Sequence, residues 1–252
     1  RVGDDLFAGR ILAALVESRV DTASILRTRG MPSGVAMVIV DRHGENAIVV
    51  SGGANHALAA TDLLARRRSI ESAKVVLLQL ETPAETVACA IALARRAGTV
   101  TILDPAPAPT DGLPESMFHV DILTPNQMEA AAMTGLPART AADAQRAAER
   151  FLNRGTRTVI VKMGSQGALI VDLDETGRSR GELVPGFRVK VVDTTAAGDA
   201  FNGALAVALA EGRPLSEAVR FANAAGALTC TKPGAMAALP TRAEVDALVA
   251  LH

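Results

Sequence analysis

The chain has 252 residues, of which 49% are hydrophobic, and a net charge of −1 from 26 Lys and Arg against 27 Asp and Glu. Such a chain can bury a substantial core, but with 2% aromatic residues, no Trp and no Tyr it has neither the basic surface nor the stacking rings typical of nucleic-acid binding. Its apolar runs, such as 75–80, are shorter than the roughly 20 residues of a membrane span. We therefore expect a soluble, cytoplasmic protein that binds neither nucleic acid nor membrane.

Helical and strand patterns alternate along the chain. Amphipathic periodicity predicts helices over 6–19, 83–96 and 141–153, and apolar runs predict strands over 75–80, 100–103 and 159–162. The residues that follow helical stretches, where a left-handed cap is preferred, are Gly98, Gly155 and Gly212. The alternation predicts an α/β fold with a parallel sheet and helices on both faces.

Two segments depart from this alternation and read as hairpins. Apolar runs at 34–40 and 47–50 flank a polar loop containing Gly44, which predicts a β-hairpin that could act as a lid. A second pair, 168–171 and 182–184, flanks a charged loop. The sequence contains no internal repeat and no segment typical of an interdomain linker, so we expect one domain over 1–252.

Cysteine and histidine give no sign of a metal site. Cys89 and Cys230 lie in apolar helical patterns, which predicts two buried free thiols in a reducing compartment. The four histidines are His43, His56, His119 and His252, and none of them has another potential metal ligand at the spacing that metal sites use.

The segment 193–199 carries the strongest chemical signal. It lies between a predicted strand over 187–192 and a predicted helix over 200–209, so its small residues Ala196, Ala197 and Gly198 would open a helix. Backbone amides there can approach a phosphoryl oxygen, and the helix dipole favours negative charge. Asp199 would repel a phosphate unless it takes a proton from an attacking hydroxyl, although an ordinary N-terminal helix carboxylate is the alternative.

The string 193–201, Asp-Thr-Thr-Ala-Ala-Gly-Asp-Ala-Phe, resembles the C-terminal signature of the ribokinase-like carbohydrate kinases, whose usual form has Gly at the position of Ala196. The resemblance continues along nearly the whole chain, through 124–129, 164–167, 184–187 and 232–235. It implies a three-layer α/β/α fold with a mostly parallel central sheet. The hairpin over 34–50 would be part of a β lid.

The resemblance also implies the reaction. ATP would phosphorylate the primary hydroxyl of a sugar, with ribose giving ribose 5-phosphate. Asp199 would be the base, and the amides of Ala196, Ala197 and Gly198 would form the anion hole. The alternatives are another sugar or nucleoside kinase of the family, such as a fructokinase-like enzyme, or a catalytically impaired sugar- or nucleotide-binding fragment. A dinucleotide-dependent oxidoreductase is disfavoured because no G-x-G-x-x-G follows a strand.

The family pattern assigns the nucleotide site. Asn126 and Glu129 would hold hydrated Mg²⁺ and phosphates, although by themselves they also read as a helix cap with a capping box. Lys162, Gly164 and Gly167 would contact the nucleotide phosphates and ribose, the alternative being a tight hairpin turn. Asn223 would lie along the adenine, or could instead face solvent.

The family pattern also predicts a cation site, a sugar site and an assembly. The positions that would surround an activating K⁺, mostly through backbone oxygens, are Asp193, Thr195, Thr229, Lys232, Gly234 and Ala238. Glu81 and Asn55 would face the sugar together with Asp199. A homodimer through the lid is expected.

One part of the family pattern has no counterpart here. Relatives carry a first strand with a sugar-contacting acid, further lid strands and a Gly-Gly-Lys-Gly-Ala-Asn-type motif ahead of the segment that resembles Gly3, Asp4 and Asp5. The chain begins at Arg1 without a Met. We therefore expect it to be N-terminally truncated relative to the family, with part of the sugar pocket absent.

Overall fold

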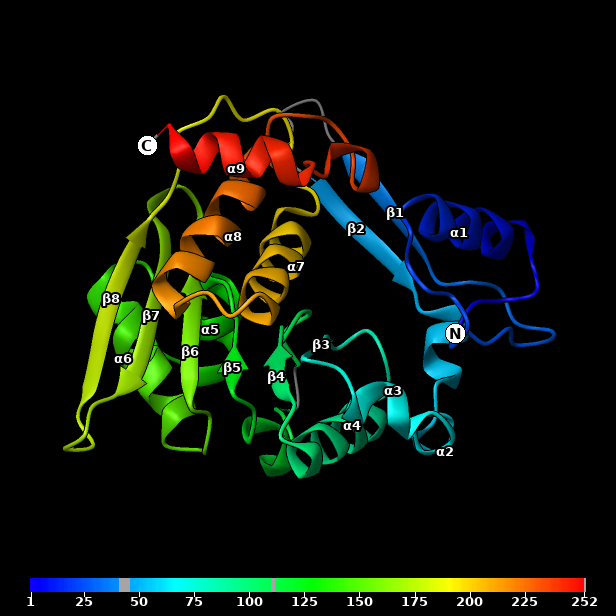
Figure 1. The fold of residues 1–252 in the computed structure, drawn as a ribbon, viewed down its shortest axis with the longest axis horizontal. Helices are drawn as coiled ribbons and strands as arrows, with labels where there is room; N and C mark the ends of the chain where they lie inside the picture. Colours follow the sequence, from blue (N-terminus) through cyan, green and yellow to red (C-terminus); the bar gives the residue numbers. More distant parts are fainter. Residues whose placement is uncertain (41–45, 110–111, 252) are drawn as a thin grey trace. The chain divides into compact units, whose positions relative to one another are not determined.

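The computed structural model describes residues 1–40, 46–109 and 112–251 (Figure 1). Packing groups the chain into two compact units, one made of Arg1–Ser69 and Glu81–Ala90, the other of Ile70–Leu80 and Ile91–His252. The expectation of one domain over 1–252 stays a prediction.

The first unit contains a hairpin and short helices. Its elements are α1 (Leu6–Glu17), β1 (Val35–Val40), β2 (Asn46–Ser51), the 3-10 turn η1 (Gly53–Ala57) and α2 (Ala60–Ala65), while α3 (Arg67–Glu71) and α4 (Ala84–Ala97) cross the boundary between the units. Asp5 caps α1 by accepting from the Ala8 amide and also accepts from the Ser33 amide at 2.7 Å. This carboxylate ties the start of α1 to the segment that leads into β1.

The hairpin strands are confirmed. β1 pairs antiparallel with β2, with Val35 opposite Ser51 and Val40 opposite Asn46. The predicted loop at 41–45, including His43 and Gly44, lies outside the described residues. A lid function for 34–50 stays a prediction.

The second unit is built on a mixed sheet in the order β3-β4-β5-β6-β7-β8. The strands are β3 (Val75–Leu78), β4 (Val100–Leu103), β5 (Ile122–Leu123), β6 (Thr158–Lys162), β7 (Gly167–Leu173) and β8 (Ser179–Pro185). β3 to β6 run parallel, and β7 and β8 add an antiparallel hairpin at one edge. The mostly parallel sheet and the second predicted hairpin are confirmed.

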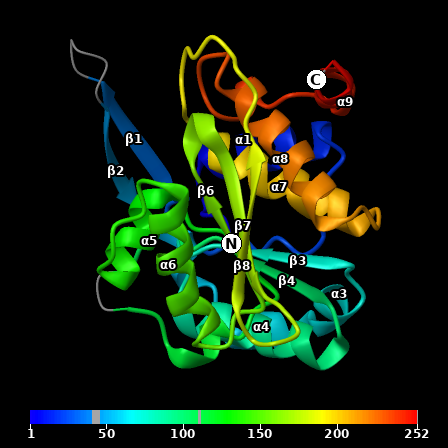
Figure 2. The same ribbon diagram turned by 90° about the vertical axis from the view of Figure 1, so that its left-hand side faces the viewer.

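Helices cover both faces of this sheet, as predicted. Figure 2 shows α5 (Gln127–Thr134) and α6 (Ala141–Leu152) on one side and α7 (Ala197–Ala210) and α8 (Leu215–Thr229) on the other. α9 (Arg242–Ala250) packs on α8. Three further 3-10 turns complete the described part of the unit: η2 (Glu115–Phe118), η3 (Gly164–Gln166) and η4 (Met236–Ala238).

One hydrophobic core lies between the sheet and the α7–α8 pair, and α6 buries Ala147 and Phe151 as well. Ile102 and Ile160 from the strands are fully buried, as are Leu205 of α7 and Ala222 of α8. Small residues along α7 and α8 let these two helices pack closely, which fixes where α7 begins relative to the strand ends. In the described residues, no helix combines the length and the apolar content needed to cross a membrane.

Most predicted elements appear within two residues of their expected bounds. The three glycines predicted to be left-handed have positive φ, 73° at Gly98, 104° at Gly155 and 80° at Gly212. The last two follow the C-caps of α6 and α7, Asn153 and Glu211, and are not the caps themselves. The strand predicted over 187–192 is wrong. Burial alternates only at its start, where Phe187 is buried and Arg188 exposed, whereas Val191 and Val192 are both exposed. β7 pairs with β8 only as far as Pro185, and in the described part of the chain no strand pairs with the residues beyond it. The prediction of buried thiols is also wrong, because Cys89 and Cys230 are both half-buried.

Candidate active site

The turn that precedes α7 is organised by Asp193. Its carboxylate accepts from the Thr195 amide at 2.9 Å, from the Thr195 hydroxyl at 2.7 Å and from the Gly234 amide at 2.9 Å. These bonds, that from Gly234 foremost, lower the pKa of Asp193 and keep it ionised. Ala196 follows with φ 60°, a left-handed conformation that turns the chain directly into the first residue of α7.

The start of α7 leaves backbone donors unpaired. Within the described chain, the amides of Ala196, Gly198 and Asp199 donate to no protein group, and the amide of Ala197 reaches the Thr194 oxygen only at 3.3 Å. With no capping side chain on Ala196, the helix end keeps its positive potential. The local geometry can therefore accept an anion.

Lys162 brings a cation to this turn from the end of β6. A Cβ built on Gly198 would lie 3.5 Å from the Lys162 ammonium nitrogen, so the two groups are neighbours. The backbone amide of Lys162 donates to the Pro125 oxygen at 2.8 Å, and the backbones of Asn126 and Lys162 form an isolated parallel β-bridge. The end of β6 and the start of α5 are therefore held side by side.

Asp104, which the sequence did not single out, is the partner of Lys162. The ammonium donates to both carboxylate oxygens, at 3.0 Å and 2.8 Å, and the side-chain amide of Asn202 in α7 donates to the same carboxylate. Burial raises the pKa of Asp104 in spite of the neighbouring ammonium. The available signal was its place just after the buried strand β4, because ligand sites of parallel sheets gather at the carboxyl ends of strands.

Asn126 and Glu129 form the capping box that was the alternative interpretation. The Asn126 side chain accepts from the Glu129 amide at 2.8 Å, and the Glu129 carboxylate accepts from the Asn126 amide at 2.7 Å. Burial raises the pKa of Glu129. Their role in holding Mg²⁺ stays a prediction, and the described residues contain no cluster of three or more acidic, His or Cys side chains placed to hold a metal.

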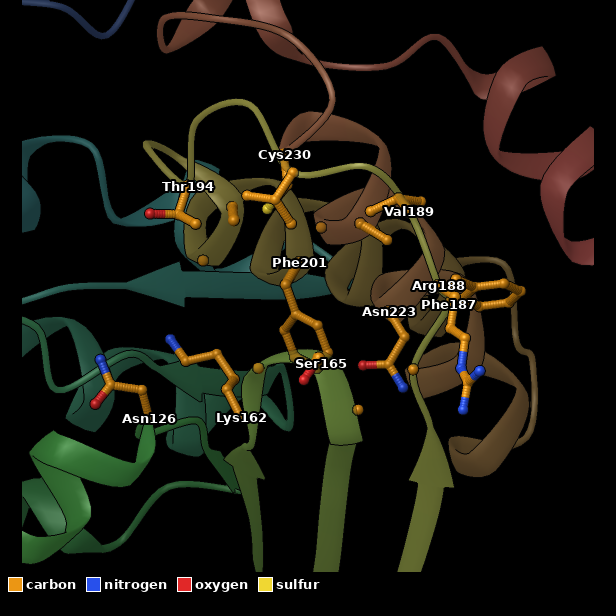
Figure 3. Close-up of a pocket in the computed structure, with 18 residues that line it drawn as sticks. Asn126, Lys162, Ser165, Phe187, Arg188, Val189, Thr194, Phe201, Asn223 and Cys230 are labelled. Carbon is orange, nitrogen blue, oxygen red and sulfur yellow. The ribbon is translucent and has the colours of Figure 1, made fainter. Parts of the chain in front are cut away.

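A cavity of about 570 Å³ opens beside the turn (Figure 3). Figure 3 shows Asn126 and Lys162 at one end of it and Asn223, Phe187 and Arg188 at the other. The predicted site residues that line it together are Asn126, Lys162, Gly164, Gly167, Ala197, Gly198 and Asn223. Sequence reasoning missed most of the apolar lining, namely Phe187, Val189, Val191, Phe201, Ala227 and Cys230.

Gly167 and Asn223 also hold the cavity wall together. Gly167 has φ 103°, and a Cβ there would lie 2.1 Å from the Val184 oxygen, so the tight-turn interpretation is confirmed for it. The residue Asn223 is 8% exposed, and its side chain donates to the main-chain oxygens of Val184 and Pro185, so the solvent-facing alternative is wrong.

The residues predicted to surround a monovalent cation lie on two adjoining segments. Asp193 and Thr195 lie on one, and Gly234 on the other donates to Asp193. The Asp193 amide also donates to the Cys230 oxygen at 3.3 Å. The remaining three have other environments: Thr229 donates to the Ala225 oxygen, Lys232 pairs with Glu244, and Ala238 is buried. Cation binding stays a prediction.

The predicted sugar-facing residues divide between the units. Asn55 lies in η1, with its side-chain nitrogen 3.1 Å from where a Cβ of Gly34 would be. Glu81 is exposed in the bend after β3. Both belong to the first unit and Asp199 to the second, so a joint role in sugar binding stays a prediction.

Comparison with known proteins identifies the chain. Residues 1–242 match the family described as pfkB family carbohydrate kinase. The chain belongs to this family. The resemblance found in the sequence and the expected α/β/α fold are thereby confirmed, and a pfkB family carbohydrate kinase is an ATP-dependent sugar kinase.

Several of the similar proteins are ribokinases, and deoxyribokinases are also among them. The chain is 35% identical to the ribokinase of Haemophilus influenzae over 96% of this chain and 78% of that protein. It is 36% identical to the ribokinase of Bacillus subtilis over 99% of this chain and 80% of that protein. Among solved structures, ribokinase from Thermotoga maritima superposes with a TM-score of 0.84 at 36% identity, covering 99% of this chain and 79% of that one. The ribokinase of Arabidopsis thaliana, solved with ribose and ATP, superposes with a TM-score of 0.87 at 30% identity, covering 99% of this chain and 80% of that one.

Proposed function

We propose that this chain transfers the γ-phosphoryl group of ATP to the primary hydroxyl of ribose. The ribokinases among its relatives support the substrate. One structural observation carries the chemistry: the start of α7 presents unpaired backbone amides beside the Lys162 ammonium. Phosphoryl transfer depends on positioning and on spreading the charge of the transferred group, and such donors supply both.

Asp199 is the proposed base. It is the third residue of α7, immediately after the unpaired amide of Gly198, and its side chain is exposed. A carboxylate at this position can take the proton of an attacking hydroxyl while the amides hold the phosphoryl oxygens. A positioned general base contributes roughly 10²- to 10⁴-fold to a rate.

The cavity in the second unit fits a nucleotide. Its volume of about 570 Å³ falls within the range typical of small-molecule sites, with Asn126 and Lys162 at the end toward the turn for phosphates and apolar residues such as Val189 and Ala227 for a base. Mg²⁺ keeps several waters and needs few carboxylates, so Glu129 with Asn126 suits it. When bound, the ion would neutralise charge that develops on the phosphates.

A coupled assay of ATP consumption against pentoses, hexoses and nucleosides tests the substrate. We expect ribose to give the highest kcat/KM. A preference for fructose or a nucleoside would support a different kinase of the family, and nucleotide binding without turnover would support the binding-fragment alternative.

Substitution of Asp199 tests the mechanism. Asp199→Asn should lower turnover at least about a hundredfold while leaving nucleotide affinity and unfolding unchanged. The matched control is Glu217→Gln, which neutralises an exposed acid at the third position of the neighbouring helix α8 and should leave turnover unchanged. Near-normal turnover of Asp199→Asn would contradict the assignment.

The remaining expectations belong to the same proposal. Monovalent activation predicts higher turnover in K⁺ than in Na⁺ at equal ionic strength, because Asp193 and Thr195 shape the turn next to the anion site. We propose a cytoplasmic homodimer, which sedimentation of the purified chain at several concentrations would test.

A further inference from the structure

A buried ion pair lies directly behind the anion-binding turn, which we define as residues 193–199. Asp104 follows β4 and Lys162 ends β6, so the pair joins two strands that are separated by β5 in the sheet. Only 9% of the Asp104 side chain and 14% of the Lys162 side chain are exposed. We propose that Asp104 is a positioning residue that fixes the Lys162 ammonium beside this turn for phosphoryl transfer, an inference that rests on the proposed function.

The geometry leaves the ammonium little freedom. A lysine ammonium has three donors, and two of them are directed at the two oxygens of Asp104, at 3.0 Å and 2.8 Å. The remaining donor is available on the side of Gly198, whose Cα hydrogens leave space for it. A lysine without such a partner would sample several rotamers of its long chain and would lose that direction.

Asn202 holds the carboxylate in turn. Its side-chain nitrogen donates to Asp104, and it lies three residues after Asp199, on the same side of α7. Asn202 is 3% exposed, and its side-chain oxygen has no protein partner in the described part of the chain. Asp104 therefore connects β4, β6 and the helix that carries the proposed base.

Stability does not explain the pair, because a buried ion pair is costly to desolvate and an apolar replacement often folds as well or better. Nor does the pair increase attraction for a triphosphate, since the Asp104 charge offsets that of Lys162. What the pair changes is the orientation of the Lys162 ammonium. Asp104 should thus lower the activation barrier without tightening the ground-state nucleotide complex, which is the pattern expected of a residue that acts in the transition state.

A double-mutant cycle separates this role from a structural one. Asp104→Asn should lower turnover at least tenfold while nucleotide affinity stays equal or becomes tighter, because a negative charge near the phosphates has been removed. Lys162→Met should lower both affinity and turnover. In the Lys162→Met background, Asp104→Asn should lower turnover by less than a further twofold, because the ammonium that Asp104 positions is then absent. Burial also favours the neutral form of Asp104 once the ammonium is removed.

The measurements are titration with a fluorescent ATP analogue, turnover of ribose at saturating ATP, and urea unfolding of each variant. The control is Asp172→Asn, which breaks an exposed ion pair with Arg180 in β7 and β8 and should change neither affinity nor turnover. Asn202→Ala is a second variant that keeps both charges; it should lower turnover severalfold with affinity within twofold.

Three results would overturn the inference. They are a nucleotide affinity of Asp104→Asn more than threefold weaker than that of the unmodified chain, a turnover loss that multiplies in the Lys162→Met background, and normal turnover of both Asp104→Asn and Asn202→Ala. An unmodified chain that binds no nucleotide would contradict the proposed function, and the inference with it. A chain that binds nucleotide and gives a multiplicative cycle would contradict the inference alone.

Discussion

The side-chain amide of Asn223 in α8 donates a hydrogen bond of 3.0 Å to the main-chain oxygen of Val184 in β8. The same amide reaches the Pro185 oxygen at 3.2 Å. The helix is thereby fixed to the strand end that forms one wall of the cavity, and the bond is shielded from water.

Loss of this contact should destabilise the fold. Asn223→Ala removes both hydrogen bonds, of which the one to the Val184 oxygen is buried, so we expect the free energy of unfolding to fall by about 1–3 kcal/mol. Urea unfolding measures this. The control is Asn153→Ala at the exposed C-terminal end of α6, expected to change stability by less than about 0.5 kcal/mol. Equal effects of the two substitutions would contradict a structural role for Asn223.

Two glycines of the same loop should respond differently to alanine. At Gly167 a Cβ would collide with the Val184 oxygen at 2.1 Å, whereas at Gly164, with φ 58°, it would meet nothing within 4 Å. Gly167→Ala should therefore lower the unfolding free energy by at least about 3 kcal/mol. Gly164→Ala should cost about 1 kcal/mol, from backbone strain alone. Thermal and urea unfolding measure both variants. A loss of unfolding free energy for Gly167→Ala that is no larger than that for Gly164→Ala would contradict the close approach of Gly167 to the Val184 oxygen.

Ala196 should be improved by glycine. With φ 60°, Ala196 has a left-handed backbone, which costs an L-residue about 1–2 kcal/mol. Glycine avoids this cost, but part of the gain is lost because glycine gives the unfolded chain more conformational freedom. We expect Ala196→Gly to raise the unfolding free energy by about 0.5–1 kcal/mol. The control Ala206→Gly, inside α7, should lower it by about 1 kcal/mol. If both substitutions destabilise, the left-handed turn at 196 is not what the structure indicates.

Glu244 should make stability depend on acid pH. Bonds from the Thr241 amide and hydroxyl, followed by Lys232, lower its pKa from 4.5 to about 2. Because the folded-state value is the lower one, the stabilisation is complete above pH 4.5 and is lost as pH falls toward 2. The difference in unfolding free energy between the unmodified chain and Glu244→Gln should shrink over that range, as measured by urea unfolding at several pH values. Thr241→Val should weaken the dependence, and a pH-independent difference would contradict it.

Elements set by local residue pattern were predictable from the sequence. Helical periodicity located α4 and α6, and the run of small residues before Asp199 indicated a turn that opens a helix, which α7 confirms. The pairing of Asn126 with Glu129 was likewise visible as a capping box, because the bonds span three residues.

Contacts between distant segments could not be predicted in this way. Asp104, Lys162 and Asn202 meet only because β4 and β6 end close to the first turns of α7, and the residues next to Asp104 in the sequence do not indicate its partners. The alternation over 187–192 was misleading for a related reason. A strand needs a neighbour to pair with, but β7, the partner of β8, begins at Gly167 opposite Pro185, and the predicted apolar face is not kept because Val191 and Val192 are exposed.

The cavity draws its entire lining from between Asn126 and Cys230. A contiguous stretch of the gene therefore encodes its walls, with Asp104 as the upstream contribution behind them. Changes upstream of Asp104 therefore leave the residues that line this cavity, and the carboxylate behind it, unaltered in sequence. A chimaera that takes its segment upstream of Asp104 from a relative should thus keep every side chain of this cavity, and its affinity for an ATP analogue should stay close to that of the unmodified chain.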